Sequence, residues 1–172
     1  MLTNIKHGKI DLSCIADGDF KPYKDGKIWS DELNRAFKTY REIFIPAGRY
    51  YVDRSLIVPS DTKIYADEHA EIVLTKGTGT LLLRNESVID GSDYKIPDDA
   101  PCDENISVCG GVWGEENEER LGYGASGRFD ENDTYHGVST CFLFSGVRGL
   151  TLKNLVFRAA AGFACQLGRT DG

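Results

Sequence analysis

The stretches NISVCGGVW at residues 105–113 and GLTLKNLVF at residues 149–157 repeat one pattern of apolar residues. Four apolar positions of the first stretch match four of the second: Ile106 with Leu150, Val108 with Leu152, Val112 with Val156 and Trp113 with Phe157. The offset between them is 44 residues (150 − 106), which is longer than a repeat unit of ~20–25 residues. The chain therefore contains an internal repeat whose copies are separated by additional sequence.

The additional sequence lies at residues 114–139, which are acidic, rich in glycine and without apolar periodicity. Without these 26 residues (139 − 114 + 1) the offset falls to 18, so we predict a repeating coil of short strands with one large inserted loop. Short strands that bury their apolar faces only against neighbouring repeats indicate a solenoid. A β-sandwich is the competing interpretation, because it too contains many short strands.

Short apolar runs, many of them separated by Gly, Asn or Asp, recur along the chain after residue 42. They lie at residues 43–45, 50–52, 55–58, 63–66, 70–74, 80–83, 105–108, 141–144, 150–152, 155–157 and 163–167. Pro-Ala-Gly at residues 46–48 predicts a sharp corner, because Pro fixes φ and Gly allows a left-handed turn. Asn105 and Asn154 are expected at stacked corners, since Asn tolerates the left-handed conformation. These runs predict an all-β fold.

One segment, residues 30–40, predicts a helix near the N-terminal end. Leu33, Ala36, Phe37 and Tyr40 follow the i, i+3, i+4, i+7 spacing of one helical face, and Ser30 is expected to cap the N-terminus. We expect this amphipathic helix to cover the open edge of the first coil. The predicted organisation is a single domain over residues 1–172, with a cap region at 14–42 and coils at 43–168.

The charge balance argues against two classes of partner. With 20 Lys and Arg against 27 Asp and Glu, the net charge is −7, which disfavours nucleic acid and anionic membranes. A neutral ligand, or an acidic one met by local Arg and Lys, is compatible with it. The N-terminus lacks the apolar run of a signal peptide, and no apolar stretch reaches the length of a membrane span. This pattern predicts a cytoplasmic location, or a secreted one if a signal peptide has been removed.

Five cysteines, an odd number, cannot all pair with one another, and no Cys-x-x-Cys occurs. With only three histidines in the chain, we expect no zinc or redox site. The cysteines are expected to be buried thiols in a reducing compartment. No metal and no cofactor are implied.

Several segments, in this order, resemble the N-terminal part of glycoside hydrolase family 28, the polygalacturonase-like group of right-handed parallel β-helix enzymes. They are DG at 25–26 with the helix at 30–40, IPAGRY at 45–50, KIYA at 63–66, AEI at 70–72 and the two repeated stretches. The likeness covers roughly residues 15–168. The Pro-Ala-Gly-x-Tyr corner is shared with pectate-lyase-like and tailspike β-helices. Gly-Gly-x-Trp, then a loop and an Asn-Leu-x-Phe strand, is more specific to the hydrolases.

This resemblance implies an all-β, right-handed parallel β-helix with an N-terminal capping helix. It also implies hydrolysis of O-glycosidic bonds in a pectin-type or related polysaccharide or oligosaccharide, without a cofactor. The family's catalytic Asp residues lie in an Asn-Thr-Asp-Gly-like strand end and a Gly-Asp-Asp segment, with Gly-His-Gly and Arg-x-Lys farther along. The last three motifs do not occur here. Asp171 matches only the end of the first motif, and we assign it no catalytic role.

The catalytic residues are therefore unknown, and we expect the main catalytic Asp residues downstream of Gly172. This chain alone is expected to be inactive. Its open last coil is expected to receive further coils of the same protein or to self-associate. The alternatives to a hydrolase are a non-catalytic β-helix, carbohydrate-binding or tailspike-like, and a polysaccharide lyase on the same fold.

Four residues are candidates for substrate binding. Arg128, Tyr135 and His136 lie in the inserted loop, and loops on a rigid scaffold are where binding residues concentrate. Arg158 follows the inward-facing Phe157 by one position, so it points onto the outer face of a sheet. Aromatic side chains bind sugars, and Arg binds uronate carboxylates. The acidic clusters at 98–99 and 115–119 are expected to be solvated loops.

Overall fold

The computed structural model describes residues 7–15, 19–78, 80–88, 102–116, 128–129, 135–136, 140–160 and 163–170. Asp98, Asp99 and Asp171, and most of the predicted inserted loop, lie outside these residues. Within them, every strand ladder is parallel except for two short hairpins. The prediction of stacked parallel strands is therefore confirmed, and a sandwich of antiparallel hairpins is excluded for this part of the chain.

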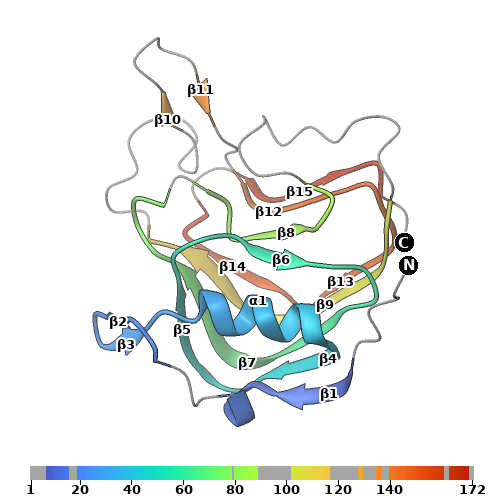
Figure 1. The fold of residues 1–172 in the computed structure, drawn as a ribbon. Coiled ribbons are helices and arrows are strands. Elements are labelled where there is room, and N and C mark those ends of the chain that lie inside the picture. Colours follow the sequence, from blue (N-terminus) through green and yellow to red (C-terminus); the bar gives the residue numbers. More distant parts are fainter. Residues whose placement is uncertain are drawn as a thin grey trace.

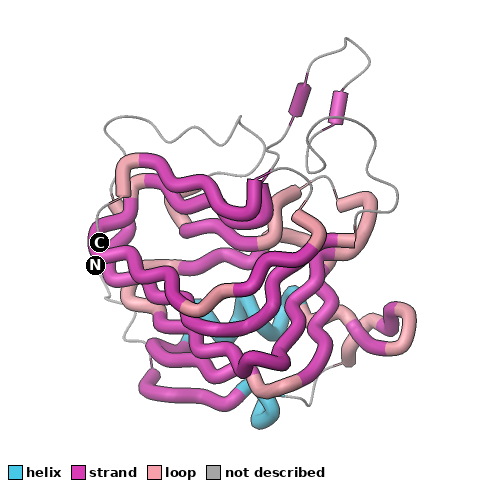
Figure 2. The backbone as a smooth tube through the Cα atoms, turned by 180° about the vertical axis from the view of Figure 1, so that it is seen from behind, coloured by secondary structure: helices cyan, strands magenta, loops and turns pink. Residues whose placement is uncertain are grey.

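Two parallel sheets hold most of the strands (Figures 1 and 2). The larger sheet contains β1 (His7–Asp11), β4 (Tyr40–Ile45), β5 (Gly48–Val52), β7 (Lys63–Leu74), β9 (Asp103–Glu115), β13 (Val147–Lys153) and β14 (Val156–Arg158). The smaller sheet contains β6 (Leu56–Val58), β8 (Leu83–Asn85), β12 (Thr140–Ser145) and β15 (Phe163–Gly168). The hairpins are β2 (Pro22–Tyr23) with β3 (Gly26–Lys27), and β10 (Arg128–Phe129) with β11 (Tyr135–His136).

The chain repeats a unit of three strand segments. The first unit is β4–β5–β6 and the last is β13–β14–β15. In the two middle units one long strand supplies the first two segments: β7, with halves at 63–66 and 70–74, is followed by β8, and β9, with halves at 103–110 and 112–115, is followed by β12. Figure 1 shows the third segments, β15, β12, β8 and β6, one below another. The predicted alignment of the two repeated stretches is confirmed, because the structure pairs the same four residue pairs. Each unit therefore lies in register on the one before it.

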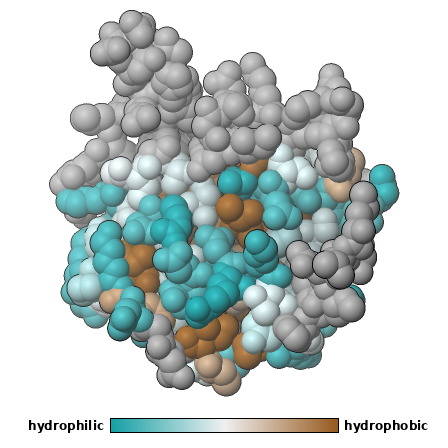
Figure 3. Space-filling view, viewed as in Figure 1, coloured by the Kyte–Doolittle hydropathy of each residue, from teal (hydrophilic) through white to brown (hydrophobic). Residues whose placement is uncertain are grey.

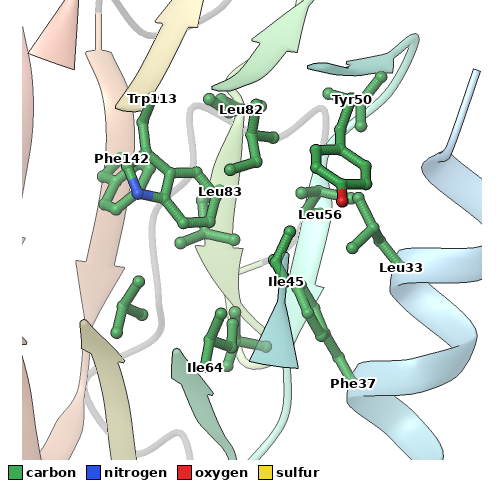
Figure 4. Close-up of a cluster of buried hydrophobic side chains, with 14 of the residues drawn as sticks. Leu33, Phe37, Ile45, Tyr50, Leu56, Ile64, Leu82, Leu83, Trp113 and Phe142 are labelled. Carbon is green, nitrogen blue, oxygen red and sulfur yellow. The ribbon is translucent and has the colours of Figure 1, made fainter. Parts of the chain in front are cut away.

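This register builds the core from three columns of inward-facing side chains. The columns are Ile10–Ile43–Ile64–Val108–Leu152, Tyr50–Ile72–Trp113–Phe157 and Leu56–Leu83–Phe142–Cys165. Members from the middle units are fully buried, whereas Leu152, Phe157 and Cys165 in the last unit are only half-buried. Figure 4 shows members of these columns meeting the helix residues Leu33 and Phe37 in one cluster. Trp113 is fully buried, and its ring packs edge-on against Phe142 at 5.0 Å between centroids.

The predicted helix is α1 (Ser30–Thr39), preceded by the short helix η1 (Leu12–Ile15). Leu33, Ala36 and Phe37 are buried as its periodicity predicts. Its exposed side is polar, in keeping with the mainly hydrophilic surface of the same view in Figure 3. Ser30 was expected to be the N-cap, and this is wrong. Trp29 holds that position, while Ser30 is the first helical residue and its hydroxyl donates to Asp53 Oδ1 at 2.7 Å.

Helix α1 covers the free edge of β6 through one side chain. The amide nitrogen Nδ2 of Asn34 donates to the Ser55 carbonyl at 3.2 Å, and its Oδ1 accepts from the Ile57 N–H at 2.8 Å. Asn34 therefore does what a neighbouring strand would do for β6. Open strand edges present backbone groups that need such partners. The predicted role of the helix as a cover for the first edge is confirmed by these contacts.

The corner between the first and second segments differs in length from unit to unit. Ala66 pairs with Gly110 and Glu71 pairs with Val112, so the corner contains four residues in β7 but only Gly111 in β9. Gly110 has φ +79°, and a Cβ atom on it would lie 2.1 Å from the Ala66 carbonyl oxygen, so only glycine fits this corner. Asn105 has φ 55° and its Nδ2 donates to Asp61 Oδ1 at 2.9 Å, which confirms it as a stacked corner residue. Asn154 also has φ 55°, but it lies at the corner between β13 and β14.

Three details differ from the sequence-based expectation. Gly114 and Glu115, predicted in the inserted loop, belong to β9. Glu115 is buried because it pairs with Leu74, a fully buried residue of β7. The run at 80–83 is buried, but its strand is β8, Leu83–Asn85. The cysteines form no disulfide; Cys141 is buried as expected, whereas Cys14 and Cys102 are exposed. No helix in the described ranges has the length and apolarity needed to cross a bilayer.

We predict that Asn34→Ala destabilises the protein by about 1–3 kcal/mol, because it leaves two backbone groups of β6 without partners. Lys38→Ala on the exposed side of α1 is the matched control, and it should change the free energy of unfolding by less than about 0.5 kcal/mol. Urea unfolding followed by circular dichroism measures both. Equal stabilities of the two variants would contradict the edge-covering role.

Candidate functional site

The second segments of the four units form a sheet face that carries charged side chains. Two outward rows flank the inward row of Trp113; they are Arg49–Glu71–Val112–Val156 and Tyr51–Val73–Gly114–Arg158. We call the outward side of β5, the second half of β7, the second half of β9, and β14 the outer face. Glu71 is the only carboxylate among these eight outward positions.

An ion-pair bridge crosses the outer face. Glu71 Oε2 lies 3.6 Å from Arg49 Nε, and Glu71 Oε1 lies 3.2 Å from an Arg158 terminal nitrogen. Arg158 comes from β14 and Glu71 from β7, so the Arg158 side chain reaches across β9. The predicted outward direction of Arg158 is thus confirmed by its contact. Gly114 of β9 leaves room for this strand, because a Cβ there would lie 2.5 Å from the Arg158 carbonyl oxygen.

The β2–β3 hairpin extends the outer face past β5. Ile28 forms a parallel bridge with Tyr51, and the Trp29 N–H donates to the Tyr51 carbonyl at 2.7 Å. The Tyr51 hydroxyl donates to Asp25 Oδ1 at 2.9 Å. This hydrogen bond holds the pKa of Asp25 below its ordinary value, and burial raises the pKa of Tyr51. Asp25 is therefore an ionised, hydrogen-bonded carboxylate at neutral pH.

The same hairpin holds Glu116, the residue that follows β9. The Tyr23 hydroxyl donates to Glu116 Oε2 at 2.6 Å, Lys24 Nζ donates to Oε1 at 2.8 Å and the Lys76 N–H donates to Oε2 at 3.3 Å. Partial burial raises the pKa of Glu116, but the three donors together outweigh it and keep the pKa below its ordinary value. Glu115 and Glu116 were expected in a solvated acidic loop, and for these two residues the structure shows that this is wrong.

A cavity of about 450 Å³ opens between residues 26–29 and the start of β5. It is lined by Gly26, Lys27, Trp29, Gly48, Arg49 and Tyr50. The Lys27 ammonium lies 3.6 Å from the Phe20 ring centroid and 4.5 Å from that of Trp29. The Trp29 and Tyr50 rings meet edge-on at 5.1 Å. The lining therefore combines two aromatic rings with two cations and contains no acidic residue.

The four sequence-predicted binding residues fall in two places. Arg158 lies on the outer face and is paired with Glu71. Arg128 pairs with His136, and Phe129 with Tyr135, along the antiparallel β10–β11 hairpin. The backbones of Arg128, Tyr135 and His136 thus lie in one hairpin. Their side chains are outside the described part of the structure. Figure 1 draws this hairpin apart from both parallel sheets.

Sequence reasoning missed Arg49, Glu71 and the cavity residues. A signal for Arg49 was present: it follows the Pro-Ala-Gly corner and precedes the inward Tyr50, so period-two alternation places it outward, as for Arg158. The cavity gave no such signal, because its walls come from the hairpin and from β5, which meet only in the folded chain. Among the described residues, no three His, Cys, Asp or Glu side chains are arranged to hold a metal ion.

No family model and no curated protein matches the sequence. Two solved structures of PfbA, a surface protein and adhesin of Streptococcus pneumoniae, are similar in fold. One has a TM-score of 0.53 at 15% identity, and the other 0.55 at 16% identity. Each comparison covers 87% of this chain, which spans 35% and 33% of the length of those chains. At this identity the likeness shows a shared fold alone.

We predict that Glu116→Gln lowers stability at pH 7 by about 1 kcal/mol, because it removes a charged acceptor of three donors. A lowered folded-state pKa stabilises the protein above the ordinary value of 4.5 and ceases to do so as the pH falls through the folded pKa. The difference between wild type and variant should therefore shrink as the pH falls below about 4.5.

Urea unfolding between pH 3 and pH 8 measures this difference. Glu104→Gln is the control, because Glu104 forms an exposed pair with Arg148 and should contribute little at any pH. A difference between wild type and Glu116→Gln that is constant over this range would contradict the ionised, hydrogen-bonded state of Glu116.

Proposed function

We propose that the chain is a right-handed parallel β-helix that binds an acidic polysaccharide on its outer face without cleaving it. The observation that carries this proposal is the Arg49–Glu71–Arg158 bridge, which joins three of the four units across one face. The three-segment repeat supports the β-helix assignment, as does the fold similarity to PfbA, which is named a surface protein and adhesin. Function is not carried over from that similarity.

The two arginines come from β5 and β14, the first and last strands of the outer face, and cations spread across a face suit a polymer with regularly placed anions. The guanidinium group has five fixed donors and binds carboxylates through pairs of hydrogen bonds. Arg49 and Arg158 are half or more exposed, at 51% and 65% of their side-chain area, so both retain access to a ligand. A pectin-type chain of uronates, the substrate class implied by the sequence resemblance, carries one carboxylate on each sugar. Lying across the strands, it would meet the two arginines in turn.

Hydrolysis, which the same resemblance implies, has less support. An inverting hydrolase needs a protonated acid and a carboxylate base ~6.5–9.5 Å apart. Glu71 is the only carboxylate among the eight outward positions, and both of its oxygens contact arginines. Asp25 and Glu116, next to the face, have lowered pKa values, so neither is the protonated acid that hydrolysis needs. These positions therefore supply no pair of acid and base, and the non-catalytic alternative is the better supported one.

Binding of galacturonate hexamer tests the proposal, with the methyl-esterified hexamer as the uncharged comparison. Calorimetry should detect the acidic oligomer, and Arg158→Gln should weaken binding by about five- to tenfold through loss of a charge-assisted contact. Arg148→Gln is the matched control: Arg148 is also 65% exposed and paired with a Glu, but it lies on β13, outside the outer face.

Two results would contradict the proposal. One is equal affinity for the acidic and esterified oligomers in wild type, or equal losses in the two arginine variants. The other is release of reducing sugar from the hexamer by the wild-type chain, which would overturn the non-catalytic part and return the hydrolase interpretation.

A further inference from the structure

The cavity between the β2–β3 hairpin and β5 lies at one end of the outer face. Residues 26–29 run beside β5, the first strand of that face along the chain, and Ile28 pairs with Tyr51. Arg49 belongs both to the outer face and to the lining of the cavity. A linear ligand that crosses the strands of the outer face would therefore reach the cavity with its end.

Hydrogen bonds anchor two aromatic residues of the cavity wall. Tyr50 is 6% exposed and its hydroxyl donates to the Pro46 carbonyl at 2.9 Å, and Trp29 is 8% exposed and tied through its N–H to β5. Gly26 and Gly48 also line the cavity, and a Cβ on Gly48 would lie 3.5 Å from the Tyr50 ring. Gly26 also lies close to Tyr51, because a Cβ on it would approach that ring to 3.2 Å. An open, shallow site with ring edges on its wall suits a sugar ring.

The two charged side chains that line the cavity, Lys27 and Arg49, are both cations. Lys27 makes no ion pair with any described residue; its ammonium group lies instead over the rings of Phe20 and Trp29. An ammonium group carries three N–H donors. The aromatic faces attract its positive charge but carry no negative charge to neutralise it. Arg49 contacts Glu71 through its Nε. On a chain whose net charge is −7, two cations in one cavity with no acidic lining residue form a local site for an anion.

We propose that this cavity binds the terminal, negatively charged sugar of the ligand, with its carboxylate or sulfate between Lys27 and Arg49 and its ring against Trp29 and Tyr50. The inference rests on the proposed function for the polymer, but it makes a claim of its own: a single anionic sugar binds here without the rest of the chain. Neutral sugars lack the group that Lys27 recognises and bind far more weakly.

Titration of the ¹⁵N-labelled protein with single sugars tests this claim. The probes are galacturonate, galactose 6-sulfate and galactose, and the readout is the indole N–H signal of each tryptophan. The Trp29 signal should shift with an anionic sugar. The Trp113 signal should not, since this indole is fully buried and donates to the Gly110 carbonyl at 2.9 Å. A preference for galacturonate or for galactose 6-sulfate distinguishes carboxylate from sulfate recognition.

Lys27→Gln should weaken binding of the anionic sugar by about fivefold or more, and Lys27→Arg should retain most of it because the positive charge stays. Lys63→Gln is the control, because Lys63 is exposed and paired with Glu42 on another face. Unchanged unfolding curves show that the Lys27 variants are folded, so a loss of binding reports the site.

Failure of this inference differs from failure of the proposed function. If the hexamer binds through Arg158 but no single sugar shifts the Trp29 signal, the cavity is not a subsite and the proposed function stands. If galactose shifts the signal as much as galacturonate does, the anion claim is wrong. If neither the hexamer nor an anionic sugar binds, both proposals are wrong.

Discussion

In-register stacking of parallel strands is the constraint on which the rest of the structure depends. Each strand segment pairs with the same segment of the next unit, so every inward position becomes a column through the molecule. The column that contains Ile64 and Val108 is apolar along its whole length, because a polar side chain there would face its apolar neighbours on both sides. Burial of these columns provides the main stabilisation, as expected when repeats bury their apolar surface only against each other.

The same register sets the outward rows. In β5, β14 and the second halves of β7 and β9, a residue one position from the inward column that contains Trp113 points to the outer face. Arg49, Glu71 and Arg158 are separated by 22 and 87 residues (71 − 49 and 158 − 71), yet stacking brings them into one ion-pair bridge. The bridge is thus a product of the repeat and not of any local motif. The first edge of the stack is covered by other segments: Asn34 of α1 bonds β6, and the residues after the β2–β3 hairpin pair with β5. The hairpin also forms one wall of the cavity.

Much of the fold could be predicted because it is repetitive. The alignment of 105–113 with 149–157 gave the correct pairing at four positions, and helical periodicity gave α1 within one residue. What could not be predicted depends on contacts between distant segments. The Ser30 hydroxyl binds Asp53 instead of capping the helix, and Glu116 binds Tyr23 and Lys24 from 92 or more residues away. Only Arg158 of the predicted site could be placed by alternation, since the cavity needs the hairpin docked on β5.

Whether stacking creates a face for an acidic sugar chain is tested most directly by a crystal structure of the protein with bound galacturonate hexamer. The oligomer is expected to lie across β5, β7, β9 and β14, with uronate carboxylates within hydrogen-bond distance of Arg49 and Arg158. An oligomer bound on another face of the stack, or along a strand without contact to either arginine, would contradict this expectation.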